Sequence, residues 1–471
     1  MSRFNLSVDN RIENLAGGKA YKESPEMQLI SLVLTSFVNE QFYRSSNETI
    51  QNLEELFNQV KDKKFIAKLG IFARIKYGMR SITHILSALI AKNIKGELWT
   101  KNYFSKVVHR VDDITEILSY YIQNYKKPIP NSLKRGLAKA FEKFDQYQLA
   151  KYRSEKKGLK LIDVVNLIHP RPNEKNKEAL KLLVENKLTS SETWESELTK
   201  AGQKATNDEE KEEFKKDVWI KLISEKKIGY FALLRNLRNI FEQAPEIMDK
   251  ALEMLIDENL IKKSLVLPFR FTTAYQELQQ TNSKVLKYVN KACDISLSNI
   301  PKFDGNTLVV LDVSGSMQGK PAEIGSLFSV ALVKSNDADL IIFSDNAQYQ
   351  VLNTDDSLIT IANSIRFASG GTNFHSIFQE ARKAYDRIII LSDMQGWIGH
   401  GTPVRDFNIY KQKFNCNPFI YSFDLQGYGS LQFPENNVFL LTGFSEKIFD
   451  LMKILETDKN ALINEIDKID I

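Results

Sequence analysis

The chain has 471 residues, 43% of them hydrophobic and 26% charged, which is enough for two or three domains with ordinary cores. Its two cysteines, Cys293 and Cys416, exclude a disulfide framework and favour a reducing compartment. The first residues lack the apolar region of a signal peptide, and no run is long enough to span a bilayer, so we expect a cytoplasmic protein without membrane attachment.

The charge, +5 in total, is unevenly divided along the chain. Residues 1–300 hold 50 Lys and Arg against 38 Asp and Glu, whereas residues 301–471 hold 14 against 21. We therefore expect the basic first part to hold any polyanionic partner. The alternative is that these charges lie on ordinary solvated helix faces, which charge balance alone does not distinguish.

Residues 25–300 are predicted to be helical, because apolar residues recur at helical spacing throughout this stretch. Pro170 and Pro172 interrupt the series once, and nothing before residue 300 has the pattern of a strand. Many helices without a heptad pattern favour stacked pairs, as in HEAT-type solenoids. The expected helices are 27–42, 46–60, 64–77, 81–91, 101–111, 112–125, 129–144, 159–167, 175–186, 191–201, 207–224, 229–242, 244–258, 273–282 and 284–295.

A basic cluster lies in the middle of the helical part. Lys and Arg neutralise phosphates and release counterions, which is the main source of affinity for RNA. Tyr147 and Tyr152 lie among the cations and are suited to stacking on unpaired bases. The alternative is a solvated basic face, with a histidine that caps a helix before Pro170. The candidate residues are Lys134, Arg135, Lys139, Lys151, Arg153, Lys156 and Lys157, followed by His169.

Three arginines further along are candidates for holding a single strand of RNA. Arg235 and Arg238 are three residues apart on a Leu-rich helix, so they share one side of it. Arg270 lies between Phe269 and Phe271. The alternative, equally weighted, is that each arginine packs against neighbouring helices and pairs with an acidic residue there.

The pattern changes at 298–305 (SNIPKFDG), where Pro and Gly end the helical run. Strands and helices then alternate, which is typical of an α/β domain with a mainly parallel, doubly wound sheet. We therefore divide the chain into domains at 1–300 and 301–471. The expected strands are 307–313, 338–343, 348–352, 387–393, 418–424 and 437–442, and the expected helices are 320–334, 355–366, 375–386, 404–414 and 445–456.

Two strands of this second part end in oxygen-bearing side chains. The runs 306–318 (NTLVVLDVSGSMQ) and 387–394 (RIIILSDM) predict strands buried on both faces, and 369–374 (SGGTNF) is a tight glycine turn. Ligands of such sheets bind where the strands end, and carboxylate and hydroxyl oxygens suit Mg²⁺. The candidate ligands are Asp312, Ser314, Ser316, Thr372 and Asp393.

This set of five residues is similar to the metal-ion-dependent adhesion site (MIDAS) of von Willebrand factor A domains. The motif D-x-S-x-S alone is a weak signal, but a threonine in a GGT turn and an aspartate that ends a later strand follow it in the right order. The resemblance implies a divalent metal, Mg²⁺. The alternative is an A-type fold whose hydroxyls cap the helix at 320–334 and bind nothing.

Four further motifs carry a resemblance over nearly the whole chain. They are 14–21 (NLAGGKAY), 108–113 (VHRVDD), 232–239 (ALLRNLRN) and 267–271 (LPFRF). In this order, followed by an A-type domain, they resemble the TROVE module of the Ro autoantigen family, including its bacterial members. No single motif is specific, whereas the succession of four is.

The resemblance implies a monomeric ring of HEAT-like helical repeats, bridged by the von Willebrand factor A-like domain. It implies that Y-like noncoding RNA binds on a basic outer face and that single-stranded 3′ ends of defective RNA bind in a central hole. It also implies a role in RNA quality control, in bacteria with an exoribonuclease as partner. The family's contacts to Y RNA match Lys151, Arg153 and His169 best.

We predict a binding protein and not an enzyme, because no Cys/His metal cluster, nucleophile elbow, P-loop or H-E-x-x-H motif is present in the sequence. Two rival functions stay open. One is a protein-interaction scaffold whose metal captures an acidic side chain of a partner. The other is a nuclease, which requires a second metal or a base near Asp312 that the sequence does not clearly offer.

Overall fold

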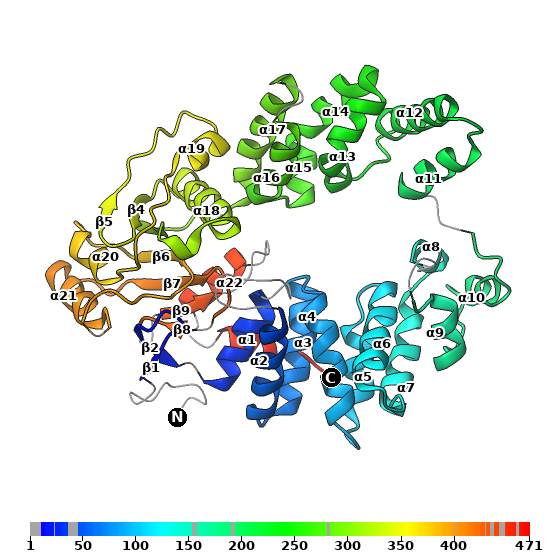
Figure 1. Cartoon of the computed structure of the whole chain (residues 1–471), viewed down its shortest axis with the longest axis horizontal. Coiled ribbons are helices and arrows are strands. Elements are labelled where there is room, and N and C mark those ends of the chain that lie inside the picture. Colours follow the sequence, from blue (N-terminus) through cyan, green and yellow to red (C-terminus); the bar gives the residue numbers. More distant parts are fainter. Residues whose placement is uncertain are drawn as a thin grey trace. The chain divides into compact units, whose positions relative to one another are not determined.

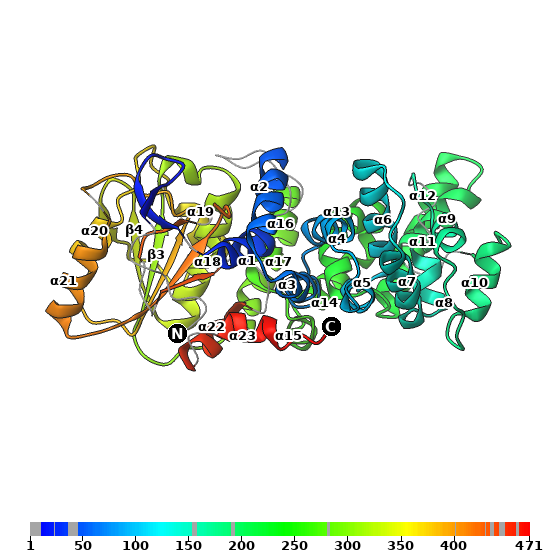
Figure 2. The same cartoon turned by 90° about the horizontal axis from the view of Figure 1, so that it is seen from below.

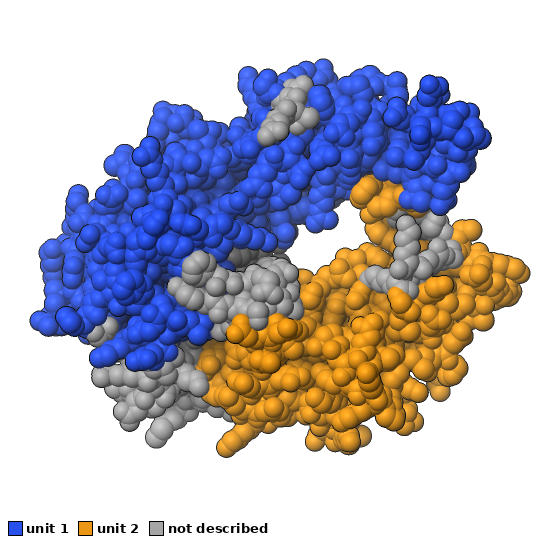
Figure 3. Space-filling model, viewed as in Figure 1, with its two compact units in different colours: residues 1–24, 197–459 blue, residues 25–196, 460–471 orange. Residues whose placement is uncertain are grey.

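The computed structural model describes residues 11–22, 24–35, 46–152, 158–189, 194–279, 283–400, 402–428, 430–433, 438–441, 448–457 and 461–471. They belong to two compact units, each made from stretches that are distant in the sequence (Figure 3). Unit 1 comprises residues 1–24 and 197–459, and unit 2 comprises residues 25–196 and 460–471. The change from helices to strands lies near residue 300 as expected, but the units divide the helical part itself.

Unit 2 is a succession of helices that pack on near neighbours in the chain (Figures 1 and 2). α4 packs on α6, and α5 packs on α7. Gly136 permits the second packing, because a Cβ at this position would lie 2.5 Å from Phe104 Cβ and 2.6 Å from the carbonyl oxygen of Lys101. The helices are α1 Pro25–Thr35, α2 Ser46–Gln59, α3 Lys63–Lys76, α4 Ser81–Asn93, α5 Trp99–Val107, α6 Val111–Tyr125, α7 Asn131–Ala140, α8 Gln146–Lys151, α9 Leu161–Ile168, α10 Lys177–Val184, α11 Trp194–Lys204 (which crosses into unit 1) and α23 Ala461–Asp467.

The C-terminal segment belongs to unit 2 because it packs on the first helices. α23 contacts α3, where Lys68 Nζ lies 3.5 Å from Asp467 Oδ1. Lys106 Nζ lies 2.9 Å from Asp470 Oδ2. The last residues are thus joined to helices that precede them by more than 350 positions.

Unit 1 combines the remaining helices with the α/β part. α17 packs on α19, and Asp294 Oδ1 accepts a 2.8 Å hydrogen bond from the backbone N–H of Leu358, which begins α19. α18 contacts the 3₁₀ turn Pro268–Arg270. These contacts explain why residues 197–300 form one unit with the strands. The helices before the sheet are α12 Asp208–Ser224, α13 Tyr230–Gln243, α14 Met248–Leu255, α15 Glu258–Ser264, α16 Thr272–Leu278 and α17 Ser283–Ser296.

A six-stranded sheet forms the core of the α/β part, in the order β5-β4-β3-β6-β7-β9. All neighbouring pairs are parallel except β4 with β5. Aromatic residues of α20 and α21 cover one face, and Phe328 of α18 stacks on Phe449 of α22 over the other. The strands are β3 Thr307–Asp312, β4 Asp339–Phe343, β5 Ala347–Tyr349, β6 Arg387–Ser392, β7 Phe419–Asp424 and β9 Val438–Leu441, and the helices are α18 Lys320–Asn336, α19 Leu358–Ser364, α20 His375–Glu380, α21 Val404–Phe414 and α22 Ile448–Thr457.

The expected helical first part and mainly parallel sheet are confirmed, with one clear error. β1 Arg11–Glu13 and β2 Lys19–Lys22 are strands, although the sequence pattern predicts none before residue 300. They form a three-stranded antiparallel sheet with β8 Ser430–Leu431. The sequence could not indicate the pairing of β2 with β8, because these strands are about 410 residues apart. β1 and β2 are close in the sequence, but they are too short for a periodic pattern.

Smaller differences concern helix lengths. α20 ends at Glu380, so the expected helix 375–386 is too long, and α8, α15 and α23 are not among the expected helices. The second half of the expected helix 27–42 lies outside the described residues. Among the helices that the structure describes, none has both the length and the apolar character needed to cross a membrane.

Candidate functional site

The five candidate metal ligands come from neighbouring strand ends of unit 1. Asp312 ends β3, and Asp393 directly follows β6, which pairs with β3 in parallel. Ser314 and Ser316 lie in the turn after β3, and a 3.1 Å hydrogen bond from Gly315 N–H to the carbonyl of Gly370 joins this turn to the loop that contains Thr372. The parallel register thus explains why motifs about 80 residues apart meet at one edge.

All five side chains are buried, with exposed fractions between 0% and 8%. The Asp312 carboxylate accepts hydrogen bonds from Ser314 N–H at 2.9 Å and from Ser392 Oγ at 2.6 Å. The hydroxyls of Ser314 and Ser316 lie 3.4 Å apart. Asp393 Oδ1 accepts from Gln395 N–H at 3.1 Å, whereas Asp393 Oδ2 is buried and has no hydrogen-bond partner among the described residues.

The burial of this cluster alters the pKa values of its two carboxyl groups. Burial, and then the charge of Asp393, raise the pKa of Asp312 to about 7. Burial also raises the pKa of Asp393. Two buried carboxylates beside hydroxyl oxygens, one carboxylate oxygen being unpartnered among the described residues, fit a hard divalent cation, which would remove the repulsion and take up that oxygen.

The alternative for these hydroxyls, helix capping, has no support in the geometry. Gly319 is the N-cap residue of α18, and no side-chain cap hydrogen bond is present there. Ser314 precedes the 3₁₀ turn Gly315–Met317, likewise without a side-chain cap bond. The geometry therefore gives these hydroxyls no role in helix capping.

The candidate RNA-binding residues of unit 2 that the structure describes lie on α7, at the end of α8 and directly after α9. Arg135 and Lys139 are exposed on α7, and Lys134 is half-buried beside them. Lys151 is exposed at the end of α8, where Tyr147 exposes 49% of its surface. Arg153, Lys156 and Lys157 lie outside the described residues.

His169 follows α9 as a left-handed C-cap residue with a φ of 49°. Its backbone N–H, and not its ring, caps the helix, through a 2.9 Å hydrogen bond to the carbonyl of Val165. The side chain is exposed. The ring is therefore not needed for capping, which leaves it available for an external ligand.

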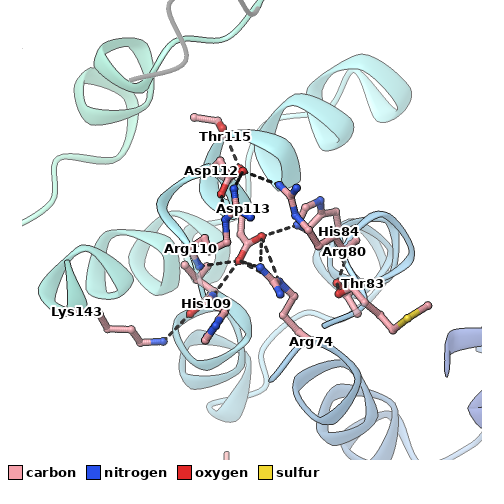
Figure 4. Close-up of polar contacts among 12 residues, drawn as sticks. Arg74, Arg80, Thr83, His84, His109, Arg110, Asp112, Asp113, Thr115 and Lys143 are labelled. Carbon is pink, nitrogen blue, oxygen red and sulfur yellow. Dashed lines mark hydrogen bonds and ion pairs between the residues drawn. The ribbon is translucent and has the colours of Figure 1, made fainter. Parts of the chain in front are cut away.

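Unit 2 also contains a buried polar network around the motif 108–113, which is not evident from the sequence (Figure 4). Asp113 is its centre. The carboxylate is 1% exposed, and both Arg74 Nη2 and His84 Nε2 lie 2.9 Å from its oxygens. The backbone N–H groups of His109 and Arg110 donate to the same carboxylate at 2.9 Å each. Burial alone would raise the pKa of Asp113, but His84 and Arg74 outweigh it and hold that pKa below its ordinary value.

The neighbouring Asp112 orients two arginines at the edge of the network (Figure 4). Arg80 Nη2 lies 2.6 Å from Asp112 Oδ2, and Arg110 Nε lies 3.0 Å from Asp112 Oδ1. The Arg110 guanidinium also stacks over the ring of Tyr152, at 4.6 Å from its centroid. The buried network thereby connects to Tyr152, the residue that follows α8.

The three arginines of unit 1 differ in their surroundings. Arg238 pairs with Glu242 at 3.1 Å and with Glu277 of α16 at 2.8 Å, as the packing alternative expects. Arg235 is exposed on α13, and the structure shows no hydrogen bond or ion pair for it among the described residues. Arg270 lies over the ring of Phe269, at 5.4 Å from its centroid.

Comparisons with known proteins agree with the helical part of this architecture. The family model described as "TROVE domain" matches residues 28–186 and 181–304. Telomerase protein component 1 of Rattus norvegicus is 22% identical over a match that covers 56% of this chain and 13% of that protein. The same component of Mus musculus is 22% identical, with 48% and 11% covered, so the chain spans only a small part of these relatives.

A solved structure is similar over almost the full length. It is the crystal structure of the Deinococcus radiodurans RO (RSR) protein, with a TM-score of 0.63 and 17% sequence identity. The match covers 94% of this chain and 99% of that one. At this identity the likeness concerns the fold.

Proposed function

This chain belongs to the TROVE-domain family, and from that premise we propose that it is an RNA-binding protein of the Ro type. The observation that carries the proposal is the set of exposed cations on α7 and at the end of α8, within the matched stretch 28–186. The resemblance to the Ro family supports it, since that resemblance implies noncoding RNA as the ligand.

We propose that a structured, Y-like RNA binds at this basic surface. Arg135, Lys139 and Lys151 would neutralise phosphates, and the exposed ring of Tyr147 offers a face for an unpaired base. His169 would add a hydrogen bond to the sugar or to a base. Arg110 is a further candidate cation, because Asp112 and the ring of Tyr152 hold its guanidinium in one orientation.

The proposal includes a second RNA site, for single-stranded 3′ ends of defective RNA. In this proposal the helical repeats close into a monomeric ring, and Arg235, with Arg238 and Arg270, faces its hole. Such a site fits a role in RNA quality control, with an exoribonuclease as partner. We propose binding and not catalysis as the activity of the chain itself.

The salt dependence of RNA binding tests the first site. With Lys151 and Arg153 both changed to Glu, the affinity for a structured RNA should fall. The slope of log K against log salt should flatten by roughly 0.7–0.9 for each phosphate that the protein no longer neutralises. Lys250→Glu, which alters an exposed lysine of α14 in unit 1, is the matched control. An unchanged slope in the double variant would mean that these two cations do not touch RNA.

We further propose that Mg²⁺ is the resident cofactor of unit 1, held by Asp312, Ser314, Ser316, Thr372 and Asp393. When bound, it would supply an open coordination position for water or a carboxylate. The oxygen of Asp393 that has no partner among the described residues supports this metal site. The second candidate function is a metal-dependent protein-interaction site without a role in RNA binding. A gel shift with structured RNA separates the two, because a pure protein binder should form no tight, salt-sensitive complex.

A further inference from the structure

The loop at the N-terminus of the described chain lies directly against the segment that follows Asp393. Asn14 Nδ2 donates a 2.7 Å hydrogen bond to the carbonyl of Gly396. The backbone N–H of Leu15 donates to Gln395 Oε1, also at 2.7 Å. Asn14 is 8% exposed and Gln395 only 1%, so the first bond is buried and the second partly buried.

Asn14 and Gly18 give this loop its shape. Asn14 Oδ1 accepts hydrogen bonds from the N–H groups of Ala16 at 3.1 Å and of Gly18 at 2.9 Å. A Cβ at Gly18 would lie 1.9 Å from the carbonyl oxygen of Gly396 and 2.6 Å from Trp397 Cα. Only glycine therefore allows the loop to approach the segment 395–397 this closely.

Gln395 connects the loop to the candidate metal ligands. Its backbone N–H donates to Asp393 Oδ1, and its Nε2 donates to the carbonyl of Asp393 at 3.2 Å and to Ser430 Oγ at 2.8 Å. Through these bonds Gln395 fixes one carboxylate oxygen of Asp393 and leaves the other, Oδ2, unpartnered among the described residues.

The same segment also holds the second loop of the site. The N–H groups of Trp397 and Ile398 donate to the carbonyl of Thr372 at 3.1 and 3.2 Å. The segment 395–398 thus contacts two candidate ligands, Asp393 and Thr372, on one side and the N-terminal loop on the other. Pairing of β2 with β8 adds a further attachment of the N-terminal segment.

We propose that the N-terminal loop, residues 14–18, is a positioning element for the metal site and that metal binding and loop docking stabilise each other. The proposal rests on the proposed Mg²⁺ site. Groups that orient metal ligands without touching the metal contribute strongly to metal affinity. Because thermodynamic coupling is reciprocal, the bound metal must in turn stabilise the docked loop. The loop continues through β2, and α1 of unit 2 begins at Pro25.

Mg²⁺ calorimetry on the full chain tests the coupling from the side of the loop. Asn14→Asp removes the donor to Gly396, and Gly18→Ala forces the loop away from it. Each should weaken Mg²⁺ binding by roughly tenfold to 100-fold. Lys19→Ala, which removes an exposed side chain of the neighbouring β2, is the matched control and should bind Mg²⁺ like the wild type.

Hydrogen–deuterium exchange of wild-type protein tests the coupling from the side of the metal and needs no altered loop. Mg²⁺ should slow amide exchange in residues 14–22, and it should have no such effect in Asp312→Ala. The wild type could bind Mg²⁺ without a change in amide exchange, and both loop variants could bind Mg²⁺ like the wild type. That result would overturn the positioning role of the loop and leave the metal site intact. If the wild type binds no Mg²⁺, the metal site and its positioning element are both overturned.

Discussion

At the scale of single residues, Asp113 shows how a buried charge is made tolerable. An isolated carboxylate at this depth would be strongly destabilising, but a guanidinium, an imidazole and two backbone N–H groups surround it. Removing the charge leaves Arg74 buried without its partner. We therefore expect Asp113 to matter more for folding than any exposed charge of unit 2.

Asp113→Asn should destabilise the protein by about 3–5 kcal/mol, the usual cost of breaking a buried ion pair. Asp112→Asn is the comparison. The Asp112 side chain is only 9% exposed, but its partners Arg80 and Arg110 are 40% and 37% exposed and can turn to water, so the expected loss is smaller. Thermal denaturation followed by circular dichroism compares the two. Equal losses would contradict the central role of Asp113.

The pH dependence of stability provides a second measurement at Asp113. Its folded-state pKa lies below the ordinary value of 3.8. The stability that the ionised group contributes is therefore complete above that value, and it is lost as the pH falls toward the depressed pKa. Between about pH 5 and pH 2.5 we expect a smaller drop in melting temperature for Asp113→Asn than for wild type. Parallel curves would mean that another carboxylate causes the acid lability.

Asp312→Ala should abolish Mg²⁺ binding measured by calorimetry and leave RNA affinity nearly intact, because the candidate RNA contacts of unit 2 share no residue with the metal site. Asp355→Ala, which removes an exposed carboxylate of the same unit, is the control and should change neither. An equal loss of RNA binding in Asp312→Ala would show that the metal site serves RNA directly.

At the scale of elements, the packing of α5 on α7 determines where the basic face of α7 lies. The close approach at Gly136 leaves no room for a methyl group, since both the backbone of Lys101 and the Cβ of Phe104 are in the way. Arg135 and Lys139 lie on either side of this glycine in the sequence and are exposed. The close packing at Gly136 thus positions the candidate RNA-binding residues Arg135 and Lys139.

Gly136→Ala should cost about 1–3 kcal/mol through overpacking and should weaken RNA binding by displacing α7. Gly158→Ala is the control, because nothing lies within 4 Å of a Cβ there. Melting temperature and RNA affinity should fall together in the first variant only. A loss of stability with normal RNA affinity would indicate that α7 does not touch RNA.

At the scale of the whole molecule, the proposed ring makes a prediction about RNA ends. A hole that admits one strand but not a duplex should favour a structured RNA with a 3′ tail of ~10 nucleotides over the same RNA made blunt. Competition between the two RNAs measures this preference. A wild type that shows none would leave the ring without a function in RNA binding.

The two arginines of α13 should contribute unequally to that preference. The acidic partners of Arg238 already engage it, whereas Arg235 has no ion pair in the described structure, so Arg235→Glu should reduce the preference more than Arg238→Glu. The double variant should abolish the preference and spare binding at Lys151. A preference that survives the double variant would identify both arginines as packing residues.

Much of this molecule followed from local patterns in the sequence. Helical periodicity located most of the helices, and continuous apolar runs located β3 and β6. Asp312 and Asp393 could be placed together in advance, because parallel strands expose their carboxyl ends at one edge of a sheet. Exposed cations such as Lys139 and Lys151 were recognisable because charged side chains seldom lie in a core.

Only the tertiary structure decided which distant segments meet. The pairing of β2 with β8, the docking of Asn14 on Gly396 and the ion pair of Arg238 with Glu277 join residues whose own neighbourhoods carry no sign of the partner. The sequence placed Asp113 in the motif 108–113 but did not indicate its burial, which depends on Arg74 and His84 from other helices. Periodicity in the sequence shows which side of a helix or strand is buried. Which other segment packs on that side depends on contacts between distant residues, and these exist only in the folded chain.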